Sequence, residues 1–559
     1  MFQGRTADDT VWTLVERRAR LSGDEPRLTF VPGGTGGVPP TTAAGAAKER
    51  DRPDEVTGWA AIAARAEAVA ARLAGLGVRP GDRVGLFGLN SLDYIVALAG
   101  VARLGAVCVP LNALLTAPEI AWQLGDAGAV ALIGEADAAG RLDEAAGPAG
   151  LTGPRLAFRG DAAGWLPLEA AGAGGAPADL PPPPGPDDVF EILYTSGTTG
   201  HPKGVMLSHR SMASEADNVA SYWAARPDDV FLAVLPLFHV NAQLVTLLPA
   251  LDRGARLVVA RSFSAGAWID LVRRHGVTIS SIVGTQVRMI MATPERPDDA
   301  GTALRCVPYG LNVPPEMWAG FERRFGAPLC NIYGLTEAVA IATAAPVHGD
   351  RRIPSVGRPG RGRAVGIFDE DGKELPAGSV GEIRIRGERG VSLMVGYHGR
   401  PDETAAAFAR GTGGDPPTGA AAAANGSDWL RTGDLGRLDE DGYLYFVDRA
   451  KDMIKRSGEN VSASEVERVL SEFPGVAEAA VVGRPDPIRD EAVVAFVVPA
   501  GAALDAGSFD IGALDGHCRA RLARFKVPEE YVVVDALPKT SIGKIEKKAL
   551  RARLEESTL

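Results

Sequence analysis

The stretch YTSGTTGHPKGVMLSH, from Tyr194 to His209, combines residue types that bind phosphate groups. Glycines let backbone N–H groups turn toward an anion, hydroxyls donate further hydrogen bonds, and lysine adds a positive charge. The stretch is not a GxxxxGK[ST] nucleotide loop, because Pro202 precedes the lysine and Gly204 follows it. An ordinary hydroxyl-rich loop is the alternative interpretation. The candidate phosphate-binding residues are Thr195, Ser196, Gly197, Thr198, Thr199 and Lys203.

A second group of candidate residues lies in NIYGLTEAVAIA, which begins at Asn331. Tyr333 offers an aromatic face on which a base can stack, and Thr336 offers a hydroxyl for a phosphate. Glu337 supplies the oxygen ligand that Mg²⁺ prefers. Taken alone, this motif is equally well explained as a turn entering a helix with an exposed carboxylate.

Two further motifs follow toward the C-terminus. Asp434 lies in a Gly-flanked turn of DWLRTGDLGRLDEDG, where its carboxylate is suited to accept hydrogen bonds from both hydroxyls of a ribose. Arg449 can bridge a ribose and a phosphate. Lys544 follows a glycine in LPKTSIGKIEKKALR, although a run of basic residues is more often a solvated face.

These residues must be positioned by an alternation of helices and strands. From Thr57 an Ala-rich amphipathic segment is followed by the apolar run RVGLFG, and then by a second helix and strand. This alternation predicts an α/β fold of parallel sheets covered by helices on both faces. Between Val365 and Ile385, short apolar runs separated by turns predict a small, barrel-like antiparallel subdomain, and Gly436–Arg449 predicts a hairpin.

The length and the charge of the chain limit the remaining classes. A chain of 559 residues is too long for one ordinary core, so we expect a large N-terminal domain, residues 1–448, and a small mobile α+β domain, residues 449–559. The net charge of −11 argues against a nucleic-acid binder. The charged N-terminal segment and the lack of a long apolar run predict a cytoplasmic protein with no membrane span. The four scattered cysteines show no metal-ligand spacing.

In this order and at these separations, the four motifs resemble the adenylate-forming superfamily of acyl-CoA synthetases, luciferases and peptide-synthetase adenylation domains. The resemblance runs from about Thr57 to Arg551. It implies a reaction in two halves. A carboxylate first attacks the α-phosphate of ATP, giving acyl-AMP and pyrophosphate. The thiol of coenzyme A then attacks the acyl carbon and releases AMP. ATP, Mg²⁺ and coenzyme A are the implied cofactors and co-substrates.

The resemblance also implies a role for each candidate residue. Lys544 approaches the α-phosphate and drives adenylation, Glu337 holds Mg²⁺, and Thr336 contacts phosphate. The small domain rotates between the two half-reactions about a hinge that corresponds to Lys451. Rotation places KRSGENV along the pantetheine tunnel, where Gly458 leaves room for the thiol arm and Lys455 assists the second step. The implied adenine, ribose and polyphosphate contacts are Tyr333 with Gly334, Gly310, Leu311 and Asn312, then Asp434 with Arg449, and the loop from Thr195 to Lys203.

The segment LPLFHVNAQLVTLLP indicates which kind of acid is activated. His239 stands where the family often places a gating or acid-contacting histidine, which we count with the catalytic residues. The amides of Asn241 and Gln243 suggest a small or polar acid, a class that includes aryl acids, because buried amides need partners. The alternative is that both amides satisfy backbone groups. FHVNAQ and YGLN resemble the carnitine/betaine-type CoA ligase branch, but the neutral Asn241 argues against a quaternary-ammonium substrate.

Three functions are compatible with these observations. The first is an ATP-dependent ligase that joins a small-molecule acid to coenzyme A. The second keeps adenylation but activates nitrite to diazotise an aromatic amine, as some relatives are understood to do. A very small acid pocket or a blocked pantetheine tunnel would favour it. The third is a non-catalytic nucleotide-binding homologue, which the joint retention of Lys203, Glu337, Asp434, Arg449 and Lys544 disfavours. The sequence leaves open whether the protein forms a homodimer.

Overall fold

The computed structural model divides the chain into two compact units. The larger contains Met1–Val365 and Ile385–Leu430, and the smaller contains Gly366–Arg384 and Arg431–Leu559. Two segments before residue 449 thus group with the C-terminal residues. The expected division into residues 1–448 and a mobile domain of residues 449–559 describes which part of the chain rotates. That division stays a prediction. The structure describes residues 8–32, 52–169, 180–195, 202–310, 312–409, 427–449, 452–456, 459–486, 490–500, 509–539 and 545–556.

The first sheet of the larger unit has nine strands among the described residues, in the order β16-β15-β14-β13-β12-β10-β11-β1-β2. Its central strands are parallel, whereas β2, β15 and β16 pair antiparallel toward the edges. The strands are β1 (Pro26–Val31), β2 (Glu55–Gly58), β10 (Val230–Ala233), β11 (Arg256–Ala260), β12 (Ile279–Val283), β13 (Val307–Gly310), β14 (Leu329–Tyr333), β15 (Thr343–Ala344) and β16 (Arg358–Pro359).

The second sheet of the larger unit has eight strands within the same described ranges, in the order β19-β9-β8-β4-β3-β5-β6-β7. It is parallel except for β9 and β19, which add an antiparallel edge next to β8. The strands are β3 (Arg83–Phe87), β4 (Val107–Leu111), β5 (Ala129–Glu135), β6 (Arg155–Phe158), β7 (Leu166–Pro167), β8 (Val189–Thr195), β9 (Lys203–Ser208) and β19 (Gly396–Tyr397).

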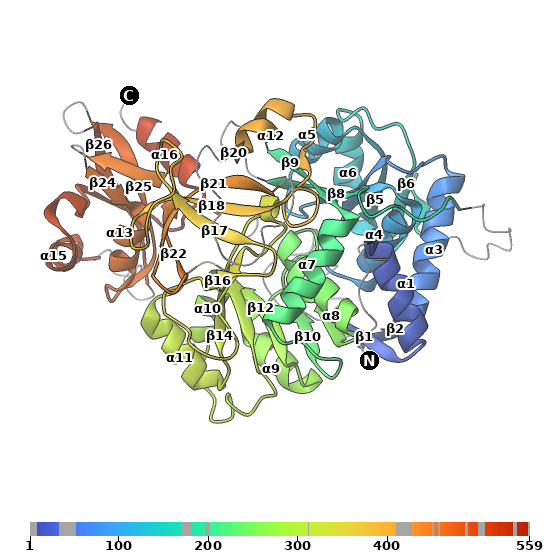
Figure 1. Ribbon diagram of the computed structural model, residues 1–559, viewed down its shortest axis with the longest axis horizontal. Helices are drawn as coiled ribbons and strands as arrows, with labels where there is room; N and C mark the ends of the chain where they lie inside the picture. The colour runs from blue at the N-terminus through green and yellow to red at the C-terminus, as the bar shows by residue number, and fades with distance from the viewer. Residues whose placement is uncertain are drawn as a thin grey trace. The chain divides into compact units, whose positions relative to one another are not determined.

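Helices connect successive parallel strands and cover the sheets (Figure 1). Local signals fix their ends. Ser91 accepts a hydrogen bond from the backbone N–H of Tyr94 at the start of α4, and Gly105 ends that helix in the left-handed conformation. The helices are α1 (Val11–Ser22), α3 (Trp59–Gly75), α4 (Leu92–Leu104), α5 (Ala117–Ala127), η1 (Ala136–Ala138), α6 (Ala139–Ala146), α7 (His209–Tyr222), η2 (Ala242–Leu247), α8 (Leu248–Arg253), α9 (Ala265–His275), α10 (Gly284–Met291), α11 (Pro315–Phe325), η3 (Thr336–Ala338) and α12 (Pro401–Ala407).

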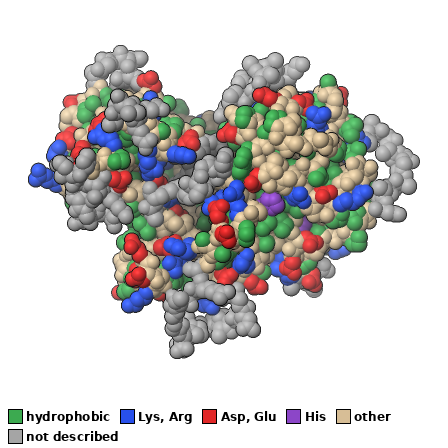
Figure 2. Space-filling view, turned by 90° about the horizontal axis from the view of Figure 1, so that it is seen from above, with side chains coloured by type: hydrophobic (Ala, Val, Ile, Leu, Met, Phe, Trp, Pro, Cys, Tyr) green, Lys and Arg blue, Asp and Glu red, His purple; other side chains and the backbone are tan. Residues whose placement is uncertain are grey.

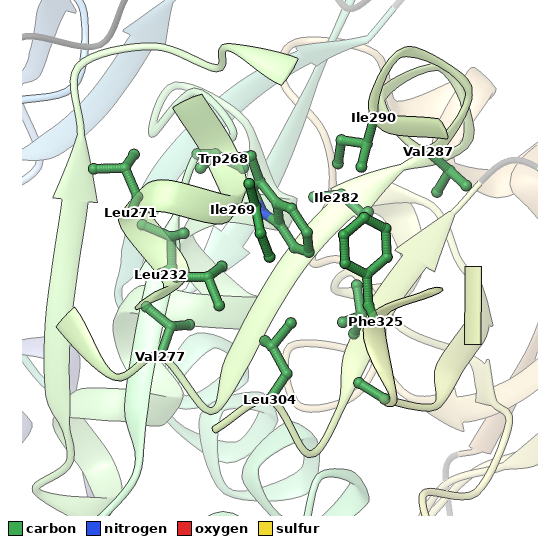
Figure 3. Close-up of a cluster of buried hydrophobic side chains, with 14 of the residues drawn as sticks. Leu232, Trp268, Ile269, Leu271, Val277, Ile282, Val287, Ile290, Leu304 and Phe325 are labelled. Carbon is green, nitrogen blue, oxygen red and sulfur yellow. The ribbon is translucent and has the colours of Figure 1, made fainter. Parts of the chain in front are cut away.

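One part of the hydrophobic core lies between the nine-stranded sheet and helices α9, α10 and α11 (Figure 3). Trp268 and Phe325 meet edge to face there, with ring centroids 5.4 Å apart. Leu232 and Ile282 contribute from the strands, and Val287 from α10. Burial of this face keeps the carboxyl ends of the parallel strands at fixed positions, which is where open α/β sheets place their ligands.

The smaller unit contains two antiparallel systems. The hairpin expected at Gly436–Arg449 is confirmed, because β21 pairs antiparallel with β22. In the C-terminal sheet, the order is β24-β23-β26-β25, with β27 parallel to β26. The elements are β17 (Ala364–Phe368), β18 (Gly381–Glu388), β20 (Phe408–Ala409), β21 (Ser427–Leu438), β22 (Leu444–Arg449), β23 (Met453–Arg456), β24 (Glu459–Ser462), α13 (Ala463–Ser471), β25 (Val476–Asp486), β26 (Asp490–Pro499), α15 (Ile511–Arg521), η5 (Arg524–Lys526), β27 (Glu530–Val533) and α16 (Lys547–Glu556), of which β20 and parts of β17, β18 and β21 belong to the larger unit.

The surface is mixed in charge. On the face that Figure 2 displays, Lys and Arg side chains are interspersed with Asp and Glu side chains. Within the described ranges, none of the helices combines the length and the apolar character needed to cross a membrane.

Candidate active site

The expected phosphate-binding stretch begins and ends on a pair of antiparallel strands. Thr195 ends β8, Lys203 begins β9, and these two residues are paired in the register. The residues between them that we expected to contact phosphate, Ser196 to Thr199, lie outside the described residues. The Thr195 hydroxyl and the Lys203 ammonium, at the two ends of the motif, therefore lie at the same end of this strand pair.

The NIYGLTEA motif forms a tight turn after β14. A Cβ added to Gly334 would lie 1.6 Å from the carbonyl oxygen of Ala340, so only glycine fits where the chain folds back on itself. Val339 and Ala340 have φ values of +52° and +75°, which non-glycine residues rarely adopt. Such strained backbone persists where the surroundings enforce it, and it gathers at functional sites. The turn places Glu337 in the short helix η3, directly before the strained residues.

A buried arginine that the sequence analysis did not single out holds this turn. Arg363 donates hydrogen bonds to the carbonyl oxygens of Ala338 at 2.8 Å, Ile341 at 2.7 Å and Ser392 at 3.0 Å. Its charge is paired with the Glu215 carboxylate of α7 at 2.7 Å. The RGRAVG stretch around Arg363 carries no local signal for this role, because all of these partners are distant in the chain.

The turn brings Glu337 to the end of β8. Its Oε1 atom accepts hydrogen bonds from the Tyr397 hydroxyl at 3.1 Å and from the Thr195 hydroxyl at 3.5 Å. Among the described residues, no group of three or more His, Cys, Asp or Glu side chains could enclose a metal ion. A single carboxylate beside the expected phosphate-binding stretch fits Mg²⁺, which is held by one or two carboxylates together with substrate phosphates.

Lys203 is held by two side chains that the sequence analysis also missed. Its Nζ atom lies 2.5 Å from Glu403 Oε2 and 5.1 Å from the centroid of the Tyr397 ring. The hydrogen bond from Lys203 lowers the pKa of Glu403, so this carboxyl stays ionised. The structure thus gathers Thr195, Lys203 and Glu337 around Tyr397.

The segment expected to contact the acid enters a π-helical element, η2, a feature frequent at functional sites. The His239 ring packs against Phe238, with centroids 4.7 Å apart. Asn241 Oδ1 accepts a hydrogen bond from the Ser281 hydroxyl at 3.1 Å. Contact of these residues with an acid stays a prediction.

Gln243 is fully buried, and its amide nitrogen is committed to other protein groups. It donates to Glu191 Oε2 at 3.1 Å and to the Leu237 carbonyl oxygen at 3.0 Å. Its Oε1 atom has no hydrogen-bond partner among the described residues, so any contact with an acid would use that oxygen. Complete burial raises the pKa of Glu191 to about 8, and this carboxyl is therefore mostly neutral at neutral pH. Its position inside the apolar strand VFEILYT is the signal that could have identified it.

The expected adenine-contacting stretch follows β13. Gly310 is the last residue of the strand, and Leu311 lies outside the described residues. Asn312 accepts a hydrogen bond on Oδ1 from Asn331 at 2.7 Å, which links this stretch to the strand of the NIYG motif. Tyr333 ends that strand and is buried.

In the smaller unit, the two expected ribose-binding residues lie side by side. Asp434 and Arg449 are paired across β21 and β22, and their charged atoms are 3.3 Å apart. Asp434 is buried, whereas the arginine side chain is partly exposed. Lys451, Gly458 and Lys544, together with the side chain of Lys455, lie outside the described residues.

Comparison with known proteins identifies the class. Residues 42–398 match the family described as AMP-binding enzyme, and residues 465–544 match its C-terminal domain. The chain belongs to this family and has its fold. It is an AMP-forming acid–CoA ligase, with ATP, Mg²⁺ and coenzyme A as cofactor and co-substrates.

Curated and solved relatives cover nearly the whole chain. The chain is 36% identical to a crotonobetaine/carnitine–CoA ligase of Salmonella typhimurium over 488 residues, 85% of this chain and 89% of the relative. The crystal structure of ATP-bound MatB from Rhodopseudomonas palustris has a TM-score of 0.81 at 28% identity, covering 98% of this chain and 99% of that one. The o-succinylbenzoate CoA synthetase of Bacillus subtilis, in complex with its acyl-adenylate, has a TM-score of 0.79 at 26% identity, covering 98% of each chain.

Proposed function

We propose that the acid which this ligase joins to coenzyme A is small or polar and carries no fixed positive charge. The observation that supports this most directly is the state of Glu191. The Glu191 carboxyl accepts a hydrogen bond from Gln243, and burial keeps it mostly neutral at neutral pH. A quaternary ammonium group would need an ionised partner or an aromatic face to offset its lost hydration. The neutral amides and hydroxyl of Asn241, Gln243 and Ser281 suit uncharged polar groups.

The relatives support an acid of this size and differ in its charge. One relative is named for crotonobetaine and carnitine, and another for o-succinylbenzoate. This chain is 36% identical to the first relative over 488 residues, but it has Asn241 where we expect an acidic residue for a cationic substrate. We therefore propose that its substrate is an aliphatic or aryl carboxylic acid whose remaining part is uncharged, which we call a neutral-tailed acid.

We assign the first half-reaction to the candidate residues that the sequence analysis singled out. The ammonium of Lys203 and the hydroxyls near it neutralise and bind the polyphosphate, since charge stabilisation is the main requirement of phosphoryl chemistry. Mg²⁺, when bound by Glu337, supplies further neutralisation of the phosphate oxygens. Lys544 contacts the α-phosphate and the carboxylate. The remaining proposed contacts are Thr195, Ser196, Gly197, Thr198, Thr199 and Thr336 to phosphate, Gly310, Leu311, Asn312, Tyr333 and Gly334 to adenine, and Asp434 and Arg449 to ribose.

We assign the second half-reaction to the loop after β22. Rotation about Lys451 exchanges Lys544 for the KRSGENV loop, in which Gly458 admits the pantetheine arm and Lys455 assists thiol attack. A single flexible residue that takes up the backbone rotation is what such a hinge requires. We also propose a cytoplasmic location, where ATP and coenzyme A are available. A homodimer stays a hypothesis, which sedimentation analysis of the full chain would decide.

ATP–pyrophosphate exchange without coenzyme A tests the proposal. The assay compares short-chain acids, aryl acids, amino-substituted aryl acids, carnitine and inorganic nitrite. We expect exchange with a neutral-tailed organic acid and a thioester after coenzyme A is added. Faster exchange with carnitine than with its neutral analogues would refute the proposed charge preference. Exchange with nitrite alone would replace the ligase assignment by a diazotising one.

A further inference from the structure

Tyr397 connects two parts of the candidate site. It belongs to the two-residue strand β19, which pairs antiparallel with β9 so that Tyr397 lies opposite Val205. Its backbone N–H donates to the Thr404 hydroxyl at 2.9 Å. The tyrosine is thus anchored by its backbone beside the strand that begins with Lys203.

The side chain of Tyr397 contacts both charged groups of the site. Its hydroxyl donates to Glu337 Oε1 at 3.1 Å, and its ring lies 5.1 Å from the Lys203 ammonium. One rigid side chain with two rotatable bonds therefore spans the distance between the lysine and the carboxylate.

A carboxylate holds Lys203 as well. Glu403 pairs with Lys203 at 2.5 Å and with Arg400 at 3.2 Å, and Arg400 reaches Asp126 at 3.3 Å. This chain of alternating charges runs from α12 to α5 and fixes the position of Glu403. The lysine consequently contacts both a carboxylate and the face of an aromatic ring, and a cation is attracted to each of them.

We propose that Tyr397 is a positioning residue that fixes the Lys203 ammonium and the Glu337 carboxylate relative to each other, so that both meet the Mg²⁺–ATP complex. The inference rests on the proposed roles of Lys203 and Glu337. The hydroxyls of Tyr397 and Thr195 donate hydrogen bonds to Oε1 of Glu337. The described residues donate no hydrogen bond to Oε2. The carboxylate is thereby turned so that one oxygen is oriented and the other is left for the metal.

Two variants separate the two contacts. Tyr397→Phe keeps the ring against Lys203 and removes the hydroxyl, whereas Tyr397→Leu removes both contacts. Tyr531→Phe is the matched control, because the Tyr531 hydroxyl donates to Asp515 at a similar 3.2 Å in the smaller unit. Calorimetric titration of ATP, once with Mg²⁺ and once with EDTA, measures how much the metal tightens nucleotide binding, independently of turnover.

For Tyr397→Phe, we expect the ratio of the two ATP affinities to fall about tenfold, the size of one lost hydrogen bond to a charged group. Its affinity in EDTA should stay within about twofold of the wild type, since the ring remains. Tyr397→Leu should also weaken binding in EDTA, by about threefold to tenfold. The control should change neither value. Circular dichroism and the melting temperature confirm that each variant is folded.

Two results would overturn the inference, and they are distinguishable. A folded Tyr397→Phe variant with the wild-type affinity ratio would show that the hydroxyl does not orient the metal ligand. Loss of affinity in EDTA and in Mg²⁺ by the same factor would show a general effect on the fold of the site. If the wild-type protein binds no ATP in either condition, the proposed roles of Lys203 and Glu337 fail first, and the inference falls with them.

Discussion

The buried carboxyl of Glu191 gives a sharp prediction about stability and pH. The side chain is completely buried, and its hydrogen bond from Gln243 does not offset the loss of hydration, so its pKa rises to about 8. Its other oxygen, Oε1, has no hydrogen-bond partner among the described residues. We expect Glu191→Gln, which keeps the shape and the bond from Gln243, to remove a pH-dependent cost of folding.

The size of this cost follows from the two pKa values. Below the ordinary value of 4.5, the carboxyl is protonated in both the folded and the unfolded chain, and the group has no effect on the pH dependence. Between 4.5 and about 8 the unfolded chain loses the proton while the folded chain keeps it, so stability falls as pH rises. At about 1.4 kcal/mol per pH unit, the loss reaches about 5 kcal/mol at pH 8 and then levels off. The stability of Glu191→Gln relative to the wild type should therefore increase as the pH rises from 4.5 to about 8.

Urea denaturation at pH 5, 6, 7 and 8, followed by tryptophan fluorescence, measures the difference in unfolding free energy. Tryptophans 59, 223 and 268 are buried in the same unit and report its unfolding. Glu67→Gln, the same substitution at an exposed position of α3, is the control. A difference between Glu191→Gln and the wild type that is equal at pH 5 and pH 8 would refute the assignment of a neutral buried carboxyl.

Three further predictions concern the site. Arg363→Met should lower the free energy of unfolding by about 3–5 kcal/mol in urea denaturation, because it leaves Glu215 buried without its partner. The double variant with Glu215→Leu should recover most of this loss, and no recovery would contradict the ion-pair explanation. Gly334→Ala should reduce ATP–pyrophosphate exchange at least about tenfold while costing about 1–3 kcal/mol in stability, because its Cβ would meet Ala340, and wild-type exchange would contradict it. Lys544→Ala should abolish exchange but spare thioester formation from supplied acyl-AMP, and equal loss of both in a folded variant would refute the division of labour.

The sequence predicted the fold class because the relevant signal is local. The apolar run RVGLFG became β3, and the Ala-rich segment before it became α3, as the alternation of periodicities indicated. The hairpin at Gly436–Arg449 followed from its turn residues in the same way. The division of the chain into compact units could not be predicted from local signals, because it depends on how strands from separate segments pair.

The candidate site was predictable where its residues are joined by a short stretch of chain. Thr195 and Lys203 face each other because one antiparallel pair connects them, and Asp434 meets Arg449 for the same reason. Gln243 shows the limit of this reasoning. Its residue type indicated a buried polar contact, but the nature of its partner, a carboxyl 52 residues away in β8, could not be read from the segment.

By itself, the sequence determined the chemistry that the motifs can perform and the order of the helices and strands, because residue type and short spacing are properties of neighbouring residues. Only the tertiary structure decided which distant groups support those motifs. Tyr397 is 60 residues from Glu337, and Arg363 is 148 residues from Glu215. Such partners are selected by the pairing of β19 with β9 and by the packing of α7 against the turn after β14, and the energy of these contacts appears only once the chain has brought both groups out of water.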